Sequence, residues 1–414
     1  MNIALSLSKD KIKIALFENV HKQAVEVFRE NGYNNVEIHN STLSEISLIE
    51  KIHSAHMIGI RSATKINQRI LEQSPKLIAI GCFCIGTDQV DLNQATRLGI
   101  PVFNAPHSNT RSVAELVIGL SIMLMRSIFP KSTAAHSHKW IKSAKGSNEL
   151  RGKILGIIGY GHIGSQVSIL AEALGMQVIY YDIRTRLPLG NARQMESLES
   201  LLKMADVITL HVPEDETTIN MLNHQRLNLM KDEACLLNAS RGRVVDLEAL
   251  ASLLKQGKLR GAAVDVFPFE PGSTQEKFDS PLIGIENVIL TPHIGGSTLE
   301  AQKNIGTEVA TKLVNFSDLG NTEGSVNFPN VNLRRNEGAT RLLHIHENRP
   351  GMLKAINAII ANRGINVSGQ YLETKKEIGY VVFDIEPLSS REQSKELRAA
   401  LENIEGTIRT RILY

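Results

Sequence analysis

GIIGYGHIG, residues 156–164, contains three glycines spaced Gly-x-Gly-x-x-Gly, at Gly159, Gly161 and Gly164. An apolar run, KILGII, leads into the glycines, and a helical pattern, SQVSILAEALG, follows them. The next strand-like run, QVIYYD, ends in Asp182. A dinucleotide-binding unit requires this order of strand, glycine turn, helix and acid-terminated strand. The stretch therefore predicts a parallel α/β domain that binds a dinucleotide.

Each glycine of this motif has a separate predicted role. Gly159 makes the tight turn, Gly161 lets the backbone approach the pyrophosphate, and Gly164 lets helix and strand pack closely. The helix N-terminus offers free N–H groups and a positive dipole end to the phosphates. Asp182 is expected to accept hydrogen bonds from the adenosine ribose and to repel a 2′-phosphate, which selects NAD over NADP. Two arginines soon after Asp182 could weaken that selection, and the alternative of an ordinary glycine turn is disfavoured by the context.

Length and charge restrict the class of protein. The chain has 414 residues, which suggests two to three domains, and its net charge is +3. Because 46 basic residues are nearly balanced by 43 acidic ones, without a basic block, no nucleic-acid partner is expected. Cys82, Cys84 and Cys235 cannot form a disulfide framework and lack zinc-ligand spacing, so they are predicted to be small buried residues, with no metal.

Hydropathy predicts no association with a membrane. The apolar stretch 116–125 is too short to cross a bilayer. The opening residues, MNIALSLSKDK, lack the basic region and cleavage pattern of a signal peptide. We therefore expect a soluble, cytoplasmic protein.

The chain alternates strand and helix patterns in two runs, over residues 12–106 and again after residue 153, and each run predicts a parallel sheet with crossover helices. Ser-x-x-Glu pairs, Ser112 with Glu115 and Ser297 with Glu300, predict capping boxes at two helix starts. Residues 317–340 are polar and read as a connecting segment. The remaining tail shows the ferredoxin-like order β-α-β-β-α-β.

Reactive side chains follow three successive strands of the second run. LLNASRGRVVD places Arg241 after a strand, GAAVDVFPFEP places Asp265 and Glu270 after the next, and ILTPHIGGST places His293 after the last. A histidine can move a proton to or from a substrate oxygen, and a carboxylate beside it raises its pKa. The guanidinium of Arg241 can hold a substrate carboxylate and polarise a carbonyl. Any one of these charges alone would more often be a solvated loop residue, but three together indicate a catalytic site.

These motifs, with LIAIGCFCIGTDQVDL at residues 77–92, resemble the D-isomer-specific 2-hydroxyacid dehydrogenases, in particular the bacterial ACT-domain branch that serves serine biosynthesis. The resemblance covers nearly the whole chain. It implies that Arg241, Glu270 and His293 are catalytic, and that the substrate is held by Arg61 and Ser62 together with Arg241. The cofactor contacts that it implies are Gly159, Gly161, His162, Ile163, Gly164, Asp182, Ala239, Ser240, Arg241, Asp265, His293, Ile294, Gly295 and Gly296.

The resemblance also implies three domains. A discontinuous substrate-binding domain comprises residues 1–106 and 300–330, and an NAD-binding Rossmann domain, residues 107–299, is inserted in it. A ferredoxin-like ACT domain covers residues 340–414. Substrate would lie in the cleft between the first two, with Gly295 and Gly296 as a hinge. Trp140 could anchor an interface or cap its own domain's core, and Lys142 is a weaker candidate for the substrate phosphate.

The activity implied is the NAD-dependent oxidation of 3-phospho-D-glycerate to 3-phosphohydroxypyruvate by a homotetramer. Feedback inhibition by L-serine is implied at His346, Asn348 and Asn366, between paired ACT domains. Ala339, where close relatives have a second glycine after Gly338, is expected to stiffen the segment and weaken that inhibition. Another D-2-hydroxyacid dehydrogenase, for example a glycerate enzyme, remains an alternative, as does an NAD-sensing corepressor of the same fold. A 2-oxoglutarate reductase side activity also stays open.

Overall fold

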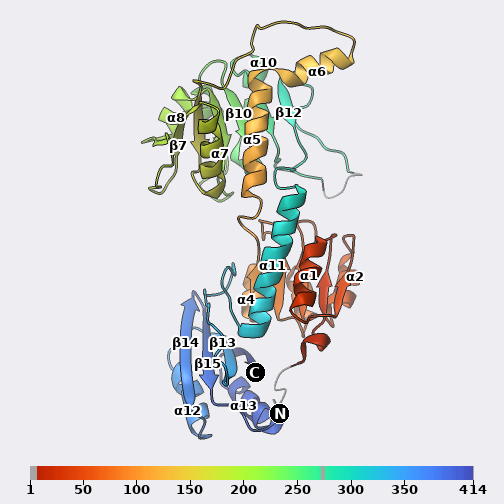
Figure 1. Ribbon diagram of the computed structural model, residues 1–414, viewed down its shortest axis with the longest axis vertical. Coiled ribbons are helices and arrows are strands. Elements are labelled where there is room, and N and C mark those ends of the chain that lie inside the picture. Colours follow the sequence, from red (N-terminus) through yellow and green to blue (C-terminus); the bar gives the residue numbers. More distant parts are fainter. Residues whose placement is uncertain (1–6, 272–275, 414) are drawn as a thin grey trace. The chain divides into compact units, whose positions relative to one another are not determined.

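The computed structural model describes residues 7–271 and 276–413, which form two compact units. The first unit joins residues 1–108 to 302–414, and the second comprises residues 109–301. Each unit is built around its own sheets and helices (Figure 1).

The first unit contains a five-stranded parallel sheet in the order β2-β1-β3-β4-β5. Its strands are β1 (Ile14–Leu16), β2 (Val36–Ile38), β3 (Met57–Ile60), β4 (Ala79–Cys82) and β5 (Val102–Phe103). The accompanying helices are η1 (Lys9–Lys11), α1 (Lys22–Glu30), α2 (Glu45–Ile52), α3 (Gln68–Glu72), α4 (Leu92–Arg97) and the long α11 (Leu299–Leu319). Hydrophobic clusters cover the sheet, and residues of α11 as distant in sequence as Leu313 pack with β1. The first domain is therefore completed by a helix from late in the chain.

The second unit contains a seven-stranded parallel sheet in the order β12-β11-β10-β9-β6-β7-β8. Its strands are β6 (Ile154–Ile158), β7 (Gln177–Tyr181), β8 (Arg193–Gln194), β9 (Val207–Leu210), β10 (Cys235–Asn238), β11 (Gly261–Val264) and β12 (Val288–Leu290). Its helices are α5 (Thr110–Met125), α6 (Ile128–His136), α7 (His162–Ala173), α8 (Leu198–Met204), α9 (His224–Asn228), η2 (Gly242–Val244) and α10 (Leu247–Lys255). Sequential strands extend outward from β6 in opposite directions, so the sheet has the switch point at which open α/β sheets bind ligands.

The C-terminal part of the first unit is an antiparallel four-stranded sheet in the order β14-β15-β13-β16. The chain runs through β13 (Thr340–Glu347), α12 (Met352–Ala361), β14 (Val367–Lys375), β15 (Ile378–Ile385), α13 (Arg391–Glu402) and β16 (Thr407–Leu413). This is the predicted β-α-β-β-α-β order. With the two parallel sheets, it confirms the fold class expected from the sequence.

Both predicted capping boxes are wrong. Helix α5 begins at Thr110, before Ser112, and the Ser112 hydroxyl instead contacts Thr298 Oγ1 at 2.7 Å. Helix α11 begins at Leu299, and the hydroxyl that accepts a hydrogen bond from its first turn belongs to Thr298, which receives Ala301 N–H at 3.1 Å. A Ser-x-x-Glu pattern occurs by chance in a helix-rich chain, and a hydroxyl one residue away can cap equally well.

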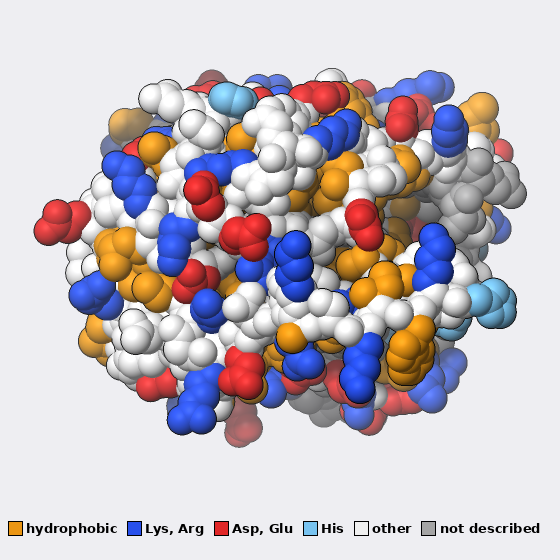
Figure 2. Space-filling view, turned by 90° about the horizontal axis from the view of Figure 1, so that it is seen from above, with side chains coloured by type: hydrophobic (Ala, Val, Ile, Leu, Met, Phe, Trp, Pro, Cys, Tyr) orange, Lys and Arg blue, Asp and Glu red, His pale blue; other side chains and the backbone are white. Residues whose placement is uncertain are grey.

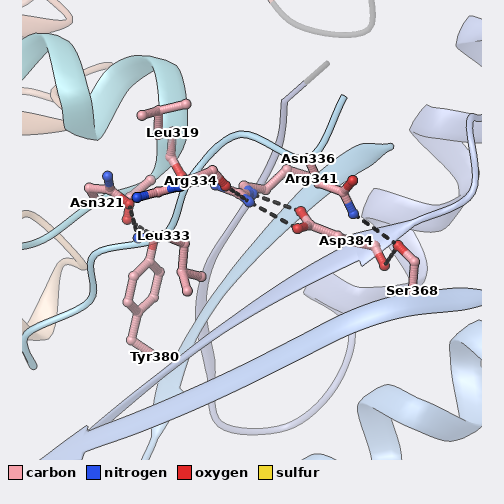
Figure 3. Close-up of polar contacts among 10 residues, drawn as sticks. Leu319, Asn321, Leu333, Arg334, Asn336, Arg341, Ser368, Tyr380 and Asp384 are labelled. Carbon is pink, nitrogen blue, oxygen red and sulfur yellow. Dashed lines mark hydrogen bonds and ion pairs between the residues drawn. The ribbon is translucent and has the colours of Figure 1, made fainter. Parts of the chain in front are cut away.

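Residues 317–340, which were expected to be a simple connecting segment, contact both the five-stranded sheet and the C-terminal sheet. Asn327 joins β5, since its Oδ1 accepts from Val102 N–H at 2.8 Å, while Phe328 and Val331 are buried. The Arg341 guanidinium forms a buried pair with Asp384, at 2.7 and 2.9 Å, and also donates to the carbonyl of Leu319 at the end of α11 (Figure 3).

The same cluster fixes more of the connection. Arg341 donates to the carbonyl of Arg334 at 2.7 Å, and Tyr380 Oη donates to the carbonyl of Gly320 at 2.6 Å. Leu333 N–H donates to Asn321 Oδ1 at 2.9 Å (Figure 3). The C-terminal sheet therefore holds both ends of the segment between α11 and β13.

The surface of the protein carries charges of both signs. On the face shown in Figure 2, basic and acidic side chains are interspersed, with hydrophobic side chains between them. Trp140 is 87% exposed, so it does not cap the core of its own domain. Of the three cysteines, Cys82 and Cys235 are buried as expected, whereas Cys84 is only partly covered, and all three are free.

Among the described residues no single helix is long and apolar enough to cross a membrane, although α5 and α6, bent by 69° at their junction, pass the length and composition test as a pair.

Candidate active site

The glycine motif forms the predicted turn between β6 and α7. Gly159 has a positive φ of 93°, and a Cβ there would collide with the carbonyl of His211. At Gly164 a Cβ would collide with the carbonyl of Gly159. Around Gly161, in contrast, a Cβ would meet no described heavy atom within 4 Å, so the surface is open above it. Two glycines are thus required by packing, and the third leaves space at the start of α7, where backbone N–H groups lack helical partners.

Asp182 lies directly after β7, beside this turn. Its Oδ2 accepts from Tyr160 N–H at 2.9 Å, and its Oδ1 accepts from Arg184 N–H at 2.9 Å. The guanidinium of Arg186 lies 3.5 Å from the carboxylate. The structure therefore places the acid next to the glycine turn and also pairs it with one of the two arginines that could affect cofactor choice.

His293 lies on a sharp turn after β12. It has a positive φ of 54°, which is unusual for a residue with a side chain. Its N–H donates to the carbonyl of Asp265 at 2.8 Å, and its ring Nδ1 is 2.7 Å from Glu270 Oε2. Such a strained position is retained when the surrounding contacts fix it, and strain of this kind often marks a functional site.

The two side chains of this pair change one another's pKa. The hydrogen bond that His293 donates to Glu270 raises the pKa of His293, against an opposing effect of burial. Burial would raise the pKa of Glu270, but hydrogen bonds from His293 and from Phe267 N–H hold it below its usual value. With Nδ1 engaged by the carboxylate, the other ring nitrogen is available for proton transfer. This is the histidine–carboxylate arrangement of an acid–base catalyst.

The buried carboxylate of Asp265 stabilises the turn that carries His293. It is only 2% exposed. Its Oδ1 accepts from Ile294 N–H at 2.9 Å and from the Thr291 hydroxyl at 2.5 Å, and its Oδ2 accepts from Gly295 N–H at 2.8 Å. A Cβ at Gly295 would lie 3.0 Å from that second oxygen. The resemblance implied that Asp265 contacts the cofactor, but this supporting role was not predicted, because no spacing rule signals it.

Arg241 lies in a turn after β10 that a buried asparagine organises. Asn238 is 1% exposed. Its Oδ1 accepts from Ser240 N–H at 3.1 Å, and its Nδ2 donates to the carbonyl of Arg241 at 3.0 Å. Gly242 follows, where a Cβ would collide with the backbone of Phe267. Sequence analysis missed Asn238, although a polar residue within an apolar strand pattern was a signal that could have identified it.

Strands β10, β11 and β12 are neighbours in the sheet, so their carboxyl ends bring the three catalytic candidates to one edge. The charge of Arg241 lowers the pKa values of both Glu270 and His293.

In the part of the chain that the structure describes, no group of three or more His, Cys, Asp or Glu residues could hold a metal ion.

Arg61 and Ser62 lie in the first unit, in the loop after β3, which a carboxylate holds in place. Glu18 accepts hydrogen bonds from Arg61 N–H at 3.2 Å and from Thr64 N–H at 2.7 Å. From the other side, Gln89 Nε2 donates to the carbonyl of Arg61 at 2.8 Å. These contacts fix the backbone of Arg61 and leave its guanidinium outside them. Glu18, with a positive φ of 61°, was not identified from the sequence.

The three residues expected to bind serine lie at opposite ends of the C-terminal sheet. His346 is paired with Gly379 at the start of β15 and is 3% exposed. Asn348 follows it, and its Nδ2 donates to the carbonyl of Lys376 at 3.0 Å. The backbone carbonyl of Asn366 accepts from Glu386 N–H, after the end of β15. At ~3.4 Å per residue, the length of β15 separates Asn366 from the other two within one chain.

The comparison with protein families agrees with this geometry. Residues 118–295 match the family described as D-isomer specific 2-hydroxyacid dehydrogenase, NAD binding domain. Residues 342–409 match an AHAS small subunit-like ACT domain. Among solved structures, D-2-hydroxyisocaproate dehydrogenase is 26% identical with a TM-score of 0.69, over 76% of this chain and 100% of that chain.

The full-length relatives are more similar in sequence. The D-3-phosphoglycerate dehydrogenase of Haemophilus influenzae is 55% identical over 100% of both chains. The protein of the same name from Escherichia coli strain K12 is 54% identical over 99% of both chains. The chain therefore belongs to the D-isomer-specific 2-hydroxyacid dehydrogenase family and is an NAD-dependent oxidoreductase. Within that family, these full-length relatives are D-3-phosphoglycerate dehydrogenases that align with 99% or more of this chain.

Proposed function

We propose that the protein oxidises 3-phospho-D-glycerate to 3-phosphohydroxypyruvate with NAD, as the first step of L-serine synthesis from that phosphate ester. The observation that carries the proposal is the contact of 2.7 Å between His293 and Glu270, which follow strands of the same parallel sheet as the dinucleotide turn. Full-length similarity to enzymes named for this substrate supports the choice among 2-hydroxyacids.

The proposed chemistry follows from the roles of three side chains. The imidazole of His293 removes the proton of the substrate hydroxyl, and Glu270 stabilises the imidazolium that forms. Bound NAD would supply the hydride acceptor for the carbon that carries this hydroxyl. Arg241 holds the substrate carboxylate and polarises the developing carbonyl, a role suited to a planar guanidinium. In the reverse direction the imidazolium returns its proton to the oxygen.

Substrate recognition is proposed to use Arg61 and Ser62 in addition to Arg241. Arg61 and Ser62 would hold the anionic end of the substrate, and the support for this is that hydrogen bonds fix the backbone of Arg61 while its guanidinium is not used by them. The cofactor would contact the glycine turn, His162, Ile163, Asp182, and the residues around Ser240 and Gly296. The implied domain boundaries, with a substrate-binding domain of residues 1–106 and 300–330, belong to the same proposal.

The test of the proposed reaction is the rate of NADH consumption with phosphohydroxypyruvate, measured beside hydroxypyruvate, pyruvate and 2-oxoglutarate. We expect the highest kcat/KM with phosphohydroxypyruvate. A higher value with hydroxypyruvate would assign the chain to the glycerate-type alternative. Failure to turn over any of these acids, with NADH still bound, would favour an NAD-sensing corepressor.

Regulation by L-serine is proposed to use a site shared by two copies of the chain. Because Asn366 lies at the far end of β15 from His346 and Asn348, one sheet cannot place all three on one small amino acid. Two C-terminal sheets arranged with a twofold axis would bring His346 and Asn348 of one copy to Asn366 of the other. A cytoplasmic homotetramer is the assembly that we propose for this arrangement.

A further inference from the structure

Two histidines on β13 and a threonine on β16 are joined by hydrogen bonds beside the proposed serine site. Nδ1 of His344 lies 3.3 Å from Nδ1 of His346, and Nε2 of His344 lies 3.1 Å from the hydroxyl of Thr407. Alternate residues of a strand point to the same face of the sheet, so the two rings meet. His344 is fully buried and His346 is 3% exposed, which keeps water away from these contacts.

Both rings are neutral at neutral pH. Burial, with the charge of His346, lowers the pKa of His344 to about 4, and burial also lowers the pKa of His346. A neutral imidazole carries a proton on one nitrogen and a lone pair on the other. The contact between the two Nδ1 atoms is therefore a hydrogen bond with one donor and one acceptor, and its direction decides which nitrogen of His346 has the proton.

The Thr407 hydroxyl sets the direction of this chain of hydrogen bonds. It has one proton, and it donates that proton to the carbonyl of Leu401 at 3.0 Å, because a carbonyl oxygen can only accept. Toward His344 the hydroxyl must then accept, so Nε2 of His344 carries the proton and its Nδ1 carries the lone pair. His346 consequently donates from Nδ1, and its Nε2 is the acceptor.

Nε2 of His346 is left for a ligand. Among the described residues it has no hydrogen-bond partner, and it is not one of the fully buried polar atoms that lack one. A Cβ at Gly379 would collide with Nε2, so only glycine at that position of β15 allows the ring to lie where it does. The lone pair of Nε2 can therefore accept one hydrogen bond from a bound molecule.

We propose that Thr407 and His344 are positioning residues for the amino acid bound by the C-terminal sheet. They hold the proton of His346 on Nδ1, and the lone pair of Nε2 accepts a hydrogen bond from the ammonium group or the hydroxyl of that amino acid. This inference rests on the proposed binding of L-serine at His346. Because Nε2 has no proton, His346 does not donate to the carboxylate of the ligand, which is left to amide and backbone N–H donors.

Neutron diffraction tests the positions of the protons without any ligand. Crystals of the full-length protein, grown in heavy water, should show deuterium on Nε2 of His344 and on Nδ1 of His346, and none on Nε2 of His346. Deuterium on Nε2 of His346 would overturn the inference and leave the proposed serine regulation standing, because a histidine with that proton could still bind serine by donating to it.

Calorimetric titration of the full-length protein with L-serine tests the positioning role. Thr407→Val keeps the shape of the side chain but leaves Nε2–H of His344 without its acceptor, so both rings can exchange tautomers. The Kd for L-serine should rise about tenfold, the effect of one lost hydrogen bond. His344→Leu removes the acceptor of His346 and should act in the same direction. Thr407→Ser, the matched control, keeps the hydroxyl and should keep the wild-type Kd, and kcat without serine should stay unchanged in all three variants.

The outcome of these titrations separates the possible roles. A wild-type Kd in Thr407→Val, or an equal loss in Thr407→Ser, would overturn the positioning role. The same titration with L-alanine, which has the ammonium group but no hydroxyl, identifies the donor: equal weakening of both ligands in Thr407→Val assigns the ammonium group, and weakening confined to L-serine assigns the hydroxyl. Wild-type protein that binds no L-serine would refute the proposed serine regulation and with it the role of these residues in binding, whatever the proton positions.

Discussion

His293 combines a left-handed backbone conformation with a hydrogen bond to Glu270, and both features depend on the residues around it. Asp265 holds the turn through Ile294 and Gly295. We expect His293→Ala to lower kcat by about 10²–10⁴-fold, because the proton acceptor is lost. NADH binding, measured by fluorescence, should persist. His224→Ala, at the start of α9, is the matched control and should keep the wild-type rate.

The Glu270 carboxylate is expected to set the pH dependence of the reaction. It raises the pKa of His293, so Glu270→Gln should lower that pKa. Oxidation needs neutral His293, which exists above its pKa, and the acid limb of the pH–rate profile should therefore move to lower pH. Reduction needs the imidazolium, which exists below the pKa of His293. In that direction, the loss of activity with rising pH should therefore begin at a lower pH in the variant. An unmoved profile would refute the assignment of this pair.

Asp182 is the residue that we expect to decide cofactor choice. Its carboxylate lies beside the glycine turn and 3.5 Å from Arg186. Asp182→Ala would remove both the acceptor for ribose hydroxyls and the charge that neutralises this arginine. The ratio of kcat/KM for NADH to that for NADPH should fall, with Arg186 free to bind a 2′-phosphate. A wild-type preference for NADPH would contradict the assigned role of Asp182.

At the scale of secondary structure, the N-terminus of helix α11 allows a direct test of whether Thr298, rather than Ser297, is its capping residue. Thr298 Oγ1 accepts from Ala301 N–H, so Thr298→Ala should lower the free energy of unfolding by about 1 kcal/mol. Ser297→Ala, the residue that the sequence pattern favoured, should have a smaller effect. Chemical denaturation of the two variants, with activity as a check on the native fold, measures the difference. Greater destabilisation by Ser297→Ala would restore the original assignment.

The elements and the catalytic candidates were largely predictable because they follow from strong local patterns. Alternating apolar runs predicted the strands, and the glycine spacing predicted the turn between β6 and α7. The supports of the site were not predictable. The Thr291 hydroxyl donates to the carboxylate of Asp265, 26 positions earlier, and Glu18 accepts from the backbone of Arg61, 43 positions later. Such contacts arise from tertiary folding, which local sequence patterns do not encode.

At the scale of the whole molecule, the split serine site predicts complementation between chains. Asn348→Ala and Asn366→Ala should each abolish inhibition by L-serine while kcat is retained. When the two variants are unfolded, mixed and refolded together, a fraction of interfaces would combine an intact Asn348 with an intact Asn366. Partial inhibition should then return. A mixture that stays fully insensitive, despite verified co-assembly, would contradict a site made from two copies.

The Arg341 cluster limits how this protein can be dissected or recombined. Arg341 belongs to the C-terminal sheet, yet it supplies donors to the carbonyls of Leu319 and Arg334 outside that sheet. A chain cut at residue 336 loses those donors at the end of α11, together with Tyr380, which holds Gly320. Altered kinetics in such a fragment would therefore have two causes that cannot be separated: the loss of regulation, and the loss of the hydrogen bonds that hold the end of α11 and Gly320. A chimera that transplants this sheet onto another dehydrogenase should carry residues 320–341 and a compatible end of α11 with it.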